Sequence, residues 1–279
     1  MTGSDRSEER TILITGARGG FGRALAEAFE QRGARVCGTL RSAAQASAMS
    51  AAARDGGRRT RYLPLELEDP ASIAALARTL EALGGVDVVI QNAGFGIFGP
   101  LELIDDATAR RQLEVNLLGP LSLARALLPQ LRRRRGRIIW IGSLAGRVAL
   151  PCQAHYSASK AALAAISDAL RIELLPLGVR VTCVEPGDFA TGFTGARQIQ
   201  RDTTGLYEVR LARCLETVEL DEREGAPPEL LARRVAALAE MEVPPARLPL
   251  GPNARLIALL AGLLPNAVRE WAVRRLYGV

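Results

Sequence analysis

The sequence has very little lysine, histidine and aromatic side chain. Of its 36 basic residues only Lys160 is a lysine, the other 35 are arginines, and the single histidine is His155. Aromatic residues make up 4% of the chain. Proteins that bind single-stranded nucleic acid combine aromatic stacking platforms with a basic groove. The net charge here is +6, but arginines and acids are interspersed, and the dense basic run at residues 132–135 falls between a helix-like and a strand-like segment. We therefore expect no nucleic-acid partner.

Metal-ligand spacing and long apolar runs are also missing from the sequence. The four cysteines, Cys37, Cys152, Cys183 and Cys214, are widely separated, so we expect no metal site. The longest apolar run near the end, residues 256–264, is too short to span a bilayer, which leaves at most weak association with a membrane surface. No secretory signal pattern begins the sequence, which favours a cytoplasmic location.

Apolar runs rich in β-branched residues alternate with segments of helical period. The predicted strands cover residues 11–15, 35–40, 61–65, 86–91, 137–142 and 179–185. The predicted helices between them include residues 22–32, 71–83, 107–131 and 156–175. This alternation predicts an α/β fold, a single doubly wound parallel sheet of the Rossmann type with helices on both faces.

The domain organisation follows from where this alternation begins and ends. Residues 1–10 are interpreted as a flexible tail and residues 11–279 as one Rossmann-type domain. Residues 192–245 are expected to form a lid over the carboxyl edge of the sheet, because this insertion, polar over residues 195–228, is too small and too charged for a separate core. They include a predicted helix at 228–241; a short edge strand in RLPLG and a C-terminal helical segment at 252–279 complete the chain.

A glycine-rich turn, TGARGGFG at residues 15–22, joins the first predicted strand to the first helix. Gly16, Gly20 and Gly22 allow a tight turn and a close approach of the backbone to a diphosphate. The N-terminus of the next helix directs free N–H groups at that anion. The strand–turn–helix context therefore predicts a dinucleotide site.

The spacing T-G-x-x-x-G-x-G resembles that of the short-chain dehydrogenase/reductase family. Further motifs follow in the family's order: QNAG at 91–94, Asn116 in EVNLLGP, Ser143 after the fifth strand, YSASK at 156–160, and Pro186-Gly187 after the sixth. GTLRS and EPGDFATGFT are similar to the hydroxysteroid and retinol dehydrogenase-like branch. The resemblance covers about residues 10–194. It implies an enzyme that interconverts a ketone or aldehyde and an alcohol with a nicotinamide cofactor.

The resemblance implies four catalytic residues: Asn116, Ser143, Tyr156 and Lys160. Tyr156 and Lys160 are four apart, so they project from one face of a helix. A cation about 4 Å away stabilises a phenolate by on the order of 4 kcal/mol at an effective dielectric near 20. Lys160, with an oxidised nicotinamide, would thus lower the phenol's pKa from about 10 toward neutrality. An arginine could neither fit so compactly nor release a proton.

The other catalytic roles come from the family alone. Ser143 would hold the substrate oxygen beside Tyr156, and Asn116 would organise a water that leads to Lys160. We expect no catalytic role for His155.

The second predicted strand bears on the choice of dinucleotide. Leu40 stands where members of the family that use NAD usually have an aspartate, and Arg41 and Arg18 could clamp a 2′-phosphate. Because arginine is so frequent here, the missing acid is the better clue. We favour NADP(H), with NAD(H) possible. The implied cofactor-binding residues are Gly16, Arg18, Gly20, Phe21, Gly22, Arg41, Glu66, Leu67, Asn92, Ala93, Gly94, Tyr156, Lys160, Pro186, Gly187, Phe189 and Thr191.

The implied substrate pocket is mostly apolar and consists of Phe95, Leu144, Ala145, Leu150 and Phe193. It favours a bulky lipophilic ketone or alcohol that is steroid-, retinoid- or polyketide-like, and the sequence does not choose among these. Three alternatives are a non-catalytic NADP(H)-binding sensor, an NAD-preferring alcohol dehydrogenase, and a sugar-nucleotide epimerase or dehydratase, whose usual glycine spacing differs. Residues 107–131 and 156–175 match helices that form a dimer or tetramer core in the family, so we expect a homodimer or homotetramer.

Overall fold

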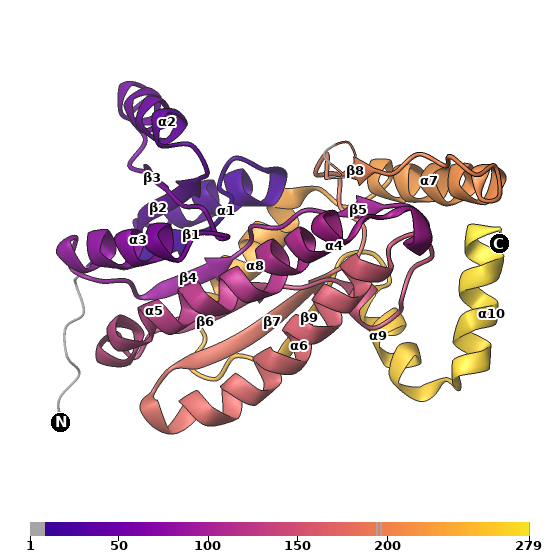
Figure 1. Ribbon diagram of the computed structural model, residues 1–279. Helices are drawn as coiled ribbons and strands as arrows, with labels where there is room; N and C mark the ends of the chain where they lie inside the picture. The colour runs from indigo at the N-terminus through magenta and orange to yellow at the C-terminus, as the bar shows by residue number, and fades with distance from the viewer. Residues whose placement is uncertain (1–8, 194, 196, 279) are drawn as a thin grey trace.

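The computed structural model describes residues 9–193, 195 and 197–278, so most of the predicted tail lies outside the described residues. Its centre is a sheet of seven parallel strands in the order β3-β2-β1-β4-β6-β7-β9 (Figure 1). The strands are β1 (Thr11–Ile14), β2 (Arg35–Leu40), β3 (Arg61–Pro64), β4 (Val88–Gln91), β6 (Arg137–Ile141), β7 (Arg180–Pro186) and β9 (Arg247–Leu250). The predicted doubly wound sheet is confirmed, and RLPLG supplies its edge strand.

Both faces of the sheet are covered by helices. One core contains residues of α1 (Gly20–Glu30), α2 (Ala43–Asp55) and α8 (Pro228–Glu240). The other contains residues of α3 (Pro70–Ala82), α5 (Gly119–Arg134) and α6 (Ala154–Leu174). Strand β6 shows why a continuous apolar run is needed: Ile139 and Ile141 enter the first core, while Ile138 and Trp140 enter the second.

The long helix predicted over residues 107–131 is interrupted. The structure has α4 (Asp106–Leu113), a π-helical turn η2 (Glu114–Leu118) and then α5. Pro120 has no N–H to donate to the carbonyl of Asn116, four residues earlier, so regular α-helical bonding cannot pass this point. The turn carries Asn116, a predicted site residue, and such turns are frequent at functional sites.

The segment after β7 contains a short strand and a helix that the sequence pattern did not predict, followed later by the predicted C-terminal helices. A short strand β8 (Gln198–Ile199) pairs in parallel with β5 (Ile97–Phe98). Helix α7 (Glu208–Arg223) follows and packs with α10 (Asn266–Tyr277), while α9 (Ala254–Leu263) packs on the turn η3 (Leu144–Gly146). Two other turns are η1 (Leu101–Leu103) and η4 (Leu175–Leu177). In the described residues, no helix combines the length and apolarity needed to cross a membrane.

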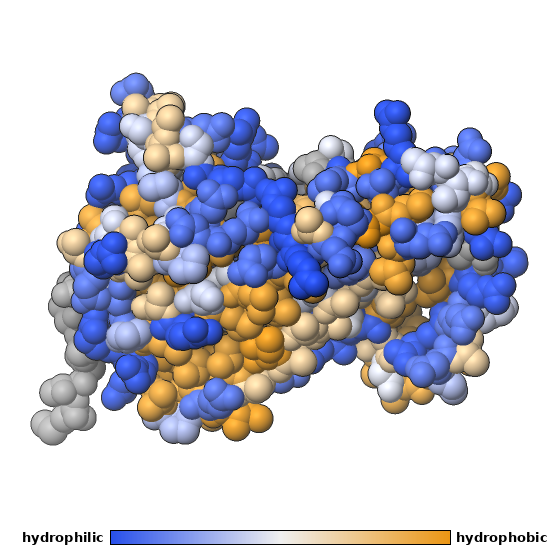
Figure 2. All heavy atoms as spheres, viewed as in Figure 1, coloured by the Kyte–Doolittle hydropathy of each residue, from blue (hydrophilic) through white to orange (hydrophobic). Residues whose placement is uncertain are grey.

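The face toward the viewer in Figure 2 carries an apolar area over α5 and α6. Ile172 of α6 is 75% exposed, and Leu118 just before α5 and Leu175 just after α6 are also exposed. An apolar area on these helices supports the expected oligomer, which stays a prediction.

We predict that α8 and the sheet unfold as one unit. Leu231 of α8 is fully buried in the core that also holds α1. Leu231→Ala should therefore cost about 2–5 kcal/mol of unfolding free energy and leave a single transition in chemical denaturation. Leu256→Ala, at a residue 54% exposed on α9, is the control and should change little. Two separate transitions in the wild-type protein would contradict a common core.

Candidate active site

The predicted phosphate turn lies where β1 meets α1. Gly16 has a φ of +67°, a left-handed conformation that favours glycine, and a Cβ placed on it would lie 3.0 Å from the Cα of Ala93. The N-cap of α1, Gly19, provides no side-chain cap, and the first turn contains no acidic residue. The first N–H groups of α1 are therefore available to an anion, as a diphosphate site requires.

Two polar side chains hold this turn against the end of β4. The hydroxyl of Thr15 accepts hydrogen bonds from the backbone N–H groups of Asn92 and Ala93, both at 2.9 Å. The Asn92 amide in turn donates to the carbonyls of Thr15 and Gly16, at 3.0 and 3.2 Å. Asn92 thus braces the glycine turn.

A cavity of about 1010 Å³ extends from this turn to the predicted catalytic residues. Every predicted site residue lines it except two, Gly22 and Asn116. Gly22 is buried in α1, and a Cβ there would overlap the carbonyl oxygen of Gly16, so its role is close packing of helix and turn. Asn116 lies behind the cavity wall.

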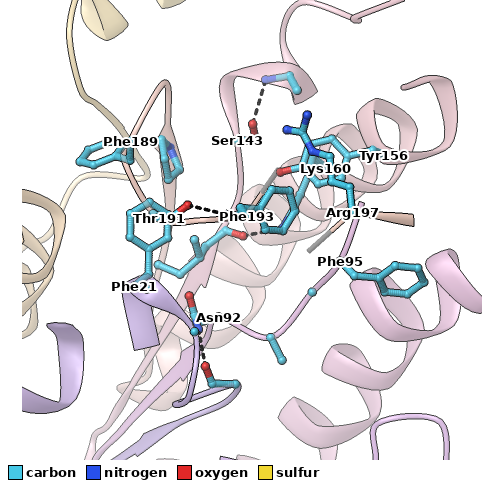
Figure 3. A pocket seen from close by; sticks show the side chains of 18 of the residues that line it. Phe21, Asn92, Phe95, Ser143, Tyr156, Lys160, Phe189, Thr191, Phe193 and Arg197 are labelled. Atoms are coloured by element: carbon cyan, nitrogen blue, oxygen red, sulfur yellow. Dashed lines mark hydrogen bonds between the residues drawn. The ribbon is translucent and has the colours of Figure 1, made fainter. Parts of the chain in front are cut away.

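Asn116 fixes the segment that follows β4. Its side-chain amide donates to the carbonyl of Phe95 at 2.8 Å, and its oxygen accepts from the N–H of the same residue at 3.0 Å. A weaker bond at 3.4 Å reaches the hydroxyl of Ser159 on α6. The Phe95 ring packs against the Arg111 guanidinium, 5.4 Å from its centre, and Figure 3 shows it apart from Tyr156 and Phe193.

The cavity end nearest β2 carries the predicted cofactor-selecting residues. Leu40 is the last residue of β2 and is buried. Arg18 and Arg41 are exposed at the cavity, and Ser42 and Gln45 also line it. Glu66 and Glu68 line it from the segment after β3.

Lys160 is buried and turned toward β6. Its ammonium donates a 2.8 Å hydrogen bond to the carbonyl of Ile141 and lies 5.8 Å from the centre of the Tyr156 ring. Burial lowers the pKa of Lys160 to about 8, because a charged ammonium is poorly solvated there. Lys160 can therefore gain or lose a proton near neutral pH.

The electrostatics of Tyr156 differ from the sequence-based expectation. Burial raises the pKa of Tyr156, while a hydrogen bond with Ser143 and the charge of Arg197 act to lower it. Lys160 is not among these causes, and its ammonium donates its hydrogen bond to the Ile141 carbonyl rather than to the phenol. Without a bound cofactor, the Tyr156 phenol is therefore held in its protonated form.

The segment after β7 closes over the glycine turn. The Glu222 carboxylate accepts hydrogen bonds from the Thr191 hydroxyl at 2.9 Å and from the Phe193 N–H at 2.6 Å. Phe189 packs edge-on against Phe21 of α1, with 5.2 Å between ring centres (Figure 3). These contacts tie α7 and the lid segment to the cofactor-binding turn.

Several cavity residues had no signal in the sequence. They are Arg197, the acids Asp188, Asp221 and Glu222, and the apolar residues Val218, Ile257, Val273, Leu276 and Tyr277. Arg197 is one of 35 arginines, so its type gave no information. The apolar group includes four residues of the C-terminal helices α9 and α10.

Comparison with known proteins agrees with this geometry. Residues 10–202 match the family described as short chain dehydrogenase. The chain is 34% identical over 278 residues to the 3-ketodihydrosphingosine reductase of Bacteroides thetaiotaomicron, covering 98% of this chain and 99% of that enzyme. It is 38% identical over 186 residues to the 11-beta-hydroxysteroid dehydrogenase type 2 of Oryctolagus cuniculus, covering 65% of this chain and 46% of that protein.

Solved structures show the same fold. A short-chain dehydrogenase from Streptomyces avermitilis superposes with a TM-score of 0.81 at 33% identity, covering 96% of this chain and 97% of that one. An alcohol dehydrogenase from Thermococcus sibiricus, complexed with 5-hydroxy-NADP, gives a TM-score of 0.72 at 26% identity and covers 88% and 97%. With the glycine turn, Ser143, Tyr156 and Lys160 around one cavity, the chain belongs to the short-chain dehydrogenase/reductase family of enzymes that act on CH–OH groups.

Proposed function

We propose that the protein is an NADP(H)-dependent oxidoreductase that interconverts a bulky lipophilic ketone and its secondary alcohol. The observation that carries this proposal is a single cavity, in which the glycine turn lies at one end and Ser143, Tyr156 and Lys160 lie at the other. One relative that matches nearly the whole chain, including the lid and C-terminal helices, is named for a keto lipid. The apolar side chains of α7, α9 and α10 at the cavity suit such a substrate.

The residues present fit a nicotinamide dinucleotide. The left-handed turn at Gly16 and the uncapped start of α1 suit its diphosphate. Arg18 and Arg41, with a neutral Leu40 as the last residue of β2, suit a 2′-phosphate. When bound, the cofactor supplies or accepts the hydride at the substrate carbon.

The chain's own residues bind the substrate oxygen and transfer its proton. In the reduction, the Ser143 hydroxyl and the Tyr156 phenol donate hydrogen bonds to the substrate carbonyl oxygen, where negative charge develops. Burial keeps the proton on Tyr156 by raising its pKa, which suits a residue that must donate it. Lys160, with a pKa of about 8, replaces that proton, and Asn116 holds the neighbouring backbone in place. Oxidation follows the same path in reverse.

The first prediction concerns Tyr156. Tyr156→Phe removes the proton donor and should lower kcat by about 10²–10⁴-fold, because general acid–base catalysis contributes that much. The dissociation constant for NADPH, measured by fluorescence, should stay within about threefold. Tyr62→Phe is the control, because Tyr62 is buried in the core and does not line the cavity. Comparable turnover by the Tyr156 variant would refute this mechanism.

The second prediction concerns the dinucleotide. Leu40→Asp places a carboxylate at the end of β2, where it would repel a 2′-phosphate. The ratio of kcat/KM for NADPH to that for NADH should fall at least about tenfold, or about 1.4 kcal/mol. Arg41→Ala should lower kcat/KM for NADPH and leave kcat/KM for NADH nearly unchanged. An unchanged ratio in both variants would rule out selection by this end of the cavity.

The third prediction concerns the burial of Lys160. The pKa of Lys160 is about 8 in the folded protein and near 10.5 when unfolded, so between these pH values the unfolded state binds more protons. The stability of the cofactor-free wild type should therefore fall relative to Lys160→Met as the pH decreases from 10 to 7. The difference in unfolding free energy between the two proteins should change by about 2 kcal/mol from pH 10 to pH 7, as measured by urea denaturation at both pH values. A difference independent of pH would show that Lys160 is not desolvated.

A further inference from the structure

Arg197 is held at the catalytic end of the cavity by a rigid local structure. It directly precedes β8, and the N–H of Gln198 donates a 2.9 Å hydrogen bond to the carbonyl of Gly96. A Cβ on Gly96 would lie 3.3 Å from the Cγ of Arg197 and 3.4 Å from its Nε, so the side chain rests on the Gly96 backbone. These contacts fix the direction of the guanidinium.

The Arg197 guanidinium belongs to the same cluster as the catalytic tyrosine. Its Cζ lies 5.2 Å from the centre of the Phe193 ring, and that ring lies 5.8 Å from the Tyr156 ring. Figure 3 shows the three side chains together in the cavity, with the glycine turn beyond Asn92. Arg197 therefore faces the place of the substrate rather than the diphosphate.

Two donor atoms of Arg197 have unused hydrogen-bonding capacity. Its Nε and Nη1 are buried, and neither has a hydrogen-bond partner among the described residues. Buried donors in native proteins almost always have an acceptor, because an unpaired one carries the full cost of lost hydration. A molecule that enters the cavity can supply the missing acceptor.

The positive charge of Arg197, in contrast, already has negatively charged side chains near it. Burial lowers the pKa of Arg197, and the nearby carboxylates of Glu222 and Asp188 oppose this. Burial also raises the pKa of Asp188, and the nearby charge of Glu222 raises it further. Burial raises the pKa of Asp221 as well, and the charge of Asp188 adds to that increase. A further carboxylate or phosphate would enter a region already crowded with negative charge. An uncharged oxygen can accept from Nε and Nη1 without that repulsion.

Building on the proposed function, we propose that Arg197 selects lipophilic ketones that carry a second, uncharged oxygen, either a hydroxyl or a carbonyl. This second oxygen is bonded to the carbon next to the reacting carbonyl carbon, or to the carbon after that one. Nε and Nη1 of Arg197 donate to that oxygen while Ser143 and Tyr156 bind the reacting one. The hydrocarbon part of the substrate lies along Val218, Ile257, Val273 and Leu276.

The test compares dodecan-3-one with its 1-hydroxy and 2-hydroxy derivatives, using NADPH and the full-length enzyme. In the wild type, at least one hydroxyketone should exceed the plain ketone in kcat/KM by about 10–100-fold, the effect of a hydrogen bond to a charged donor. In Arg197→Met this ratio should fall to about one, and Arg197→Lys should restore part of it. The ratio is internal to each variant, so a partly unfolded preparation does not change it.

Two controls separate Arg197 from other effects. Arg201→Met removes an exposed arginine of the same segment and should keep the wild-type ratio. The dissociation constant for NADPH should be unchanged in Arg197→Met, and a tenfold weaker one would place Arg197 at the cofactor and overturn the proposal. Equal kcat/KM values for the three ketones in the wild type would overturn it as well, while leaving the proposed function intact. No turnover of any ketone with NADPH or NADH would refute the proposed function itself.

Discussion

The hydrogen bond from the Lys160 ammonium to the Ile141 carbonyl joins helix α6 to the end of strand β6. Ser143 follows Ile141 by two residues and Tyr156 precedes Lys160 by one helical turn, so this bond sets the two hydroxyls that we propose to be catalytic relative to each other. Burial lowers the pKa of Lys160 to about 8, and a guanidinium in its place would stay charged and need more room. This constraint explains why a chain with 35 arginines keeps one lysine at this position.

The sequence predicted the sheet and much of the site for a common reason. In a parallel sheet the carboxyl ends of the strands meet at one edge, so residues that directly follow strands, such as Gly16, Asn92, Ser143 and Gly187, must converge. Strand-like runs and glycine turns are local signals that a single sequence contains. The interruption at Asn116 was not predicted, because apolar periodicity continues through it and only Pro120 hints at the break.

The features that the sequence could not predict depend on contacts between distant segments. The raised pKa of Tyr156 results from burial that chain neighbours alone do not reveal. Arg197 acquires its importance from its contacts with Gly96 and Phe193, and arginine is too common here for its type to mark it. The polar character of residues 208–223 concealed helix α7, whose few buried residues, Leu211, Cys214 and Val218, pack on α10 and Phe98 rather than on the sheet.

The contact between the lid segment and the glycine turn has a kinetic consequence. A Cβ on Gly20 would lie 2.7 Å from the carbonyl oxygen of Thr191, and Phe21 packs on Phe189 close by. The proposed dinucleotide would lie against this bridge, because Gly20, Phe21, Phe189 and Thr191 all line the cavity, so its exchange would require the bridge to part. Exchange of cofactor and opening of the lid are then a single event.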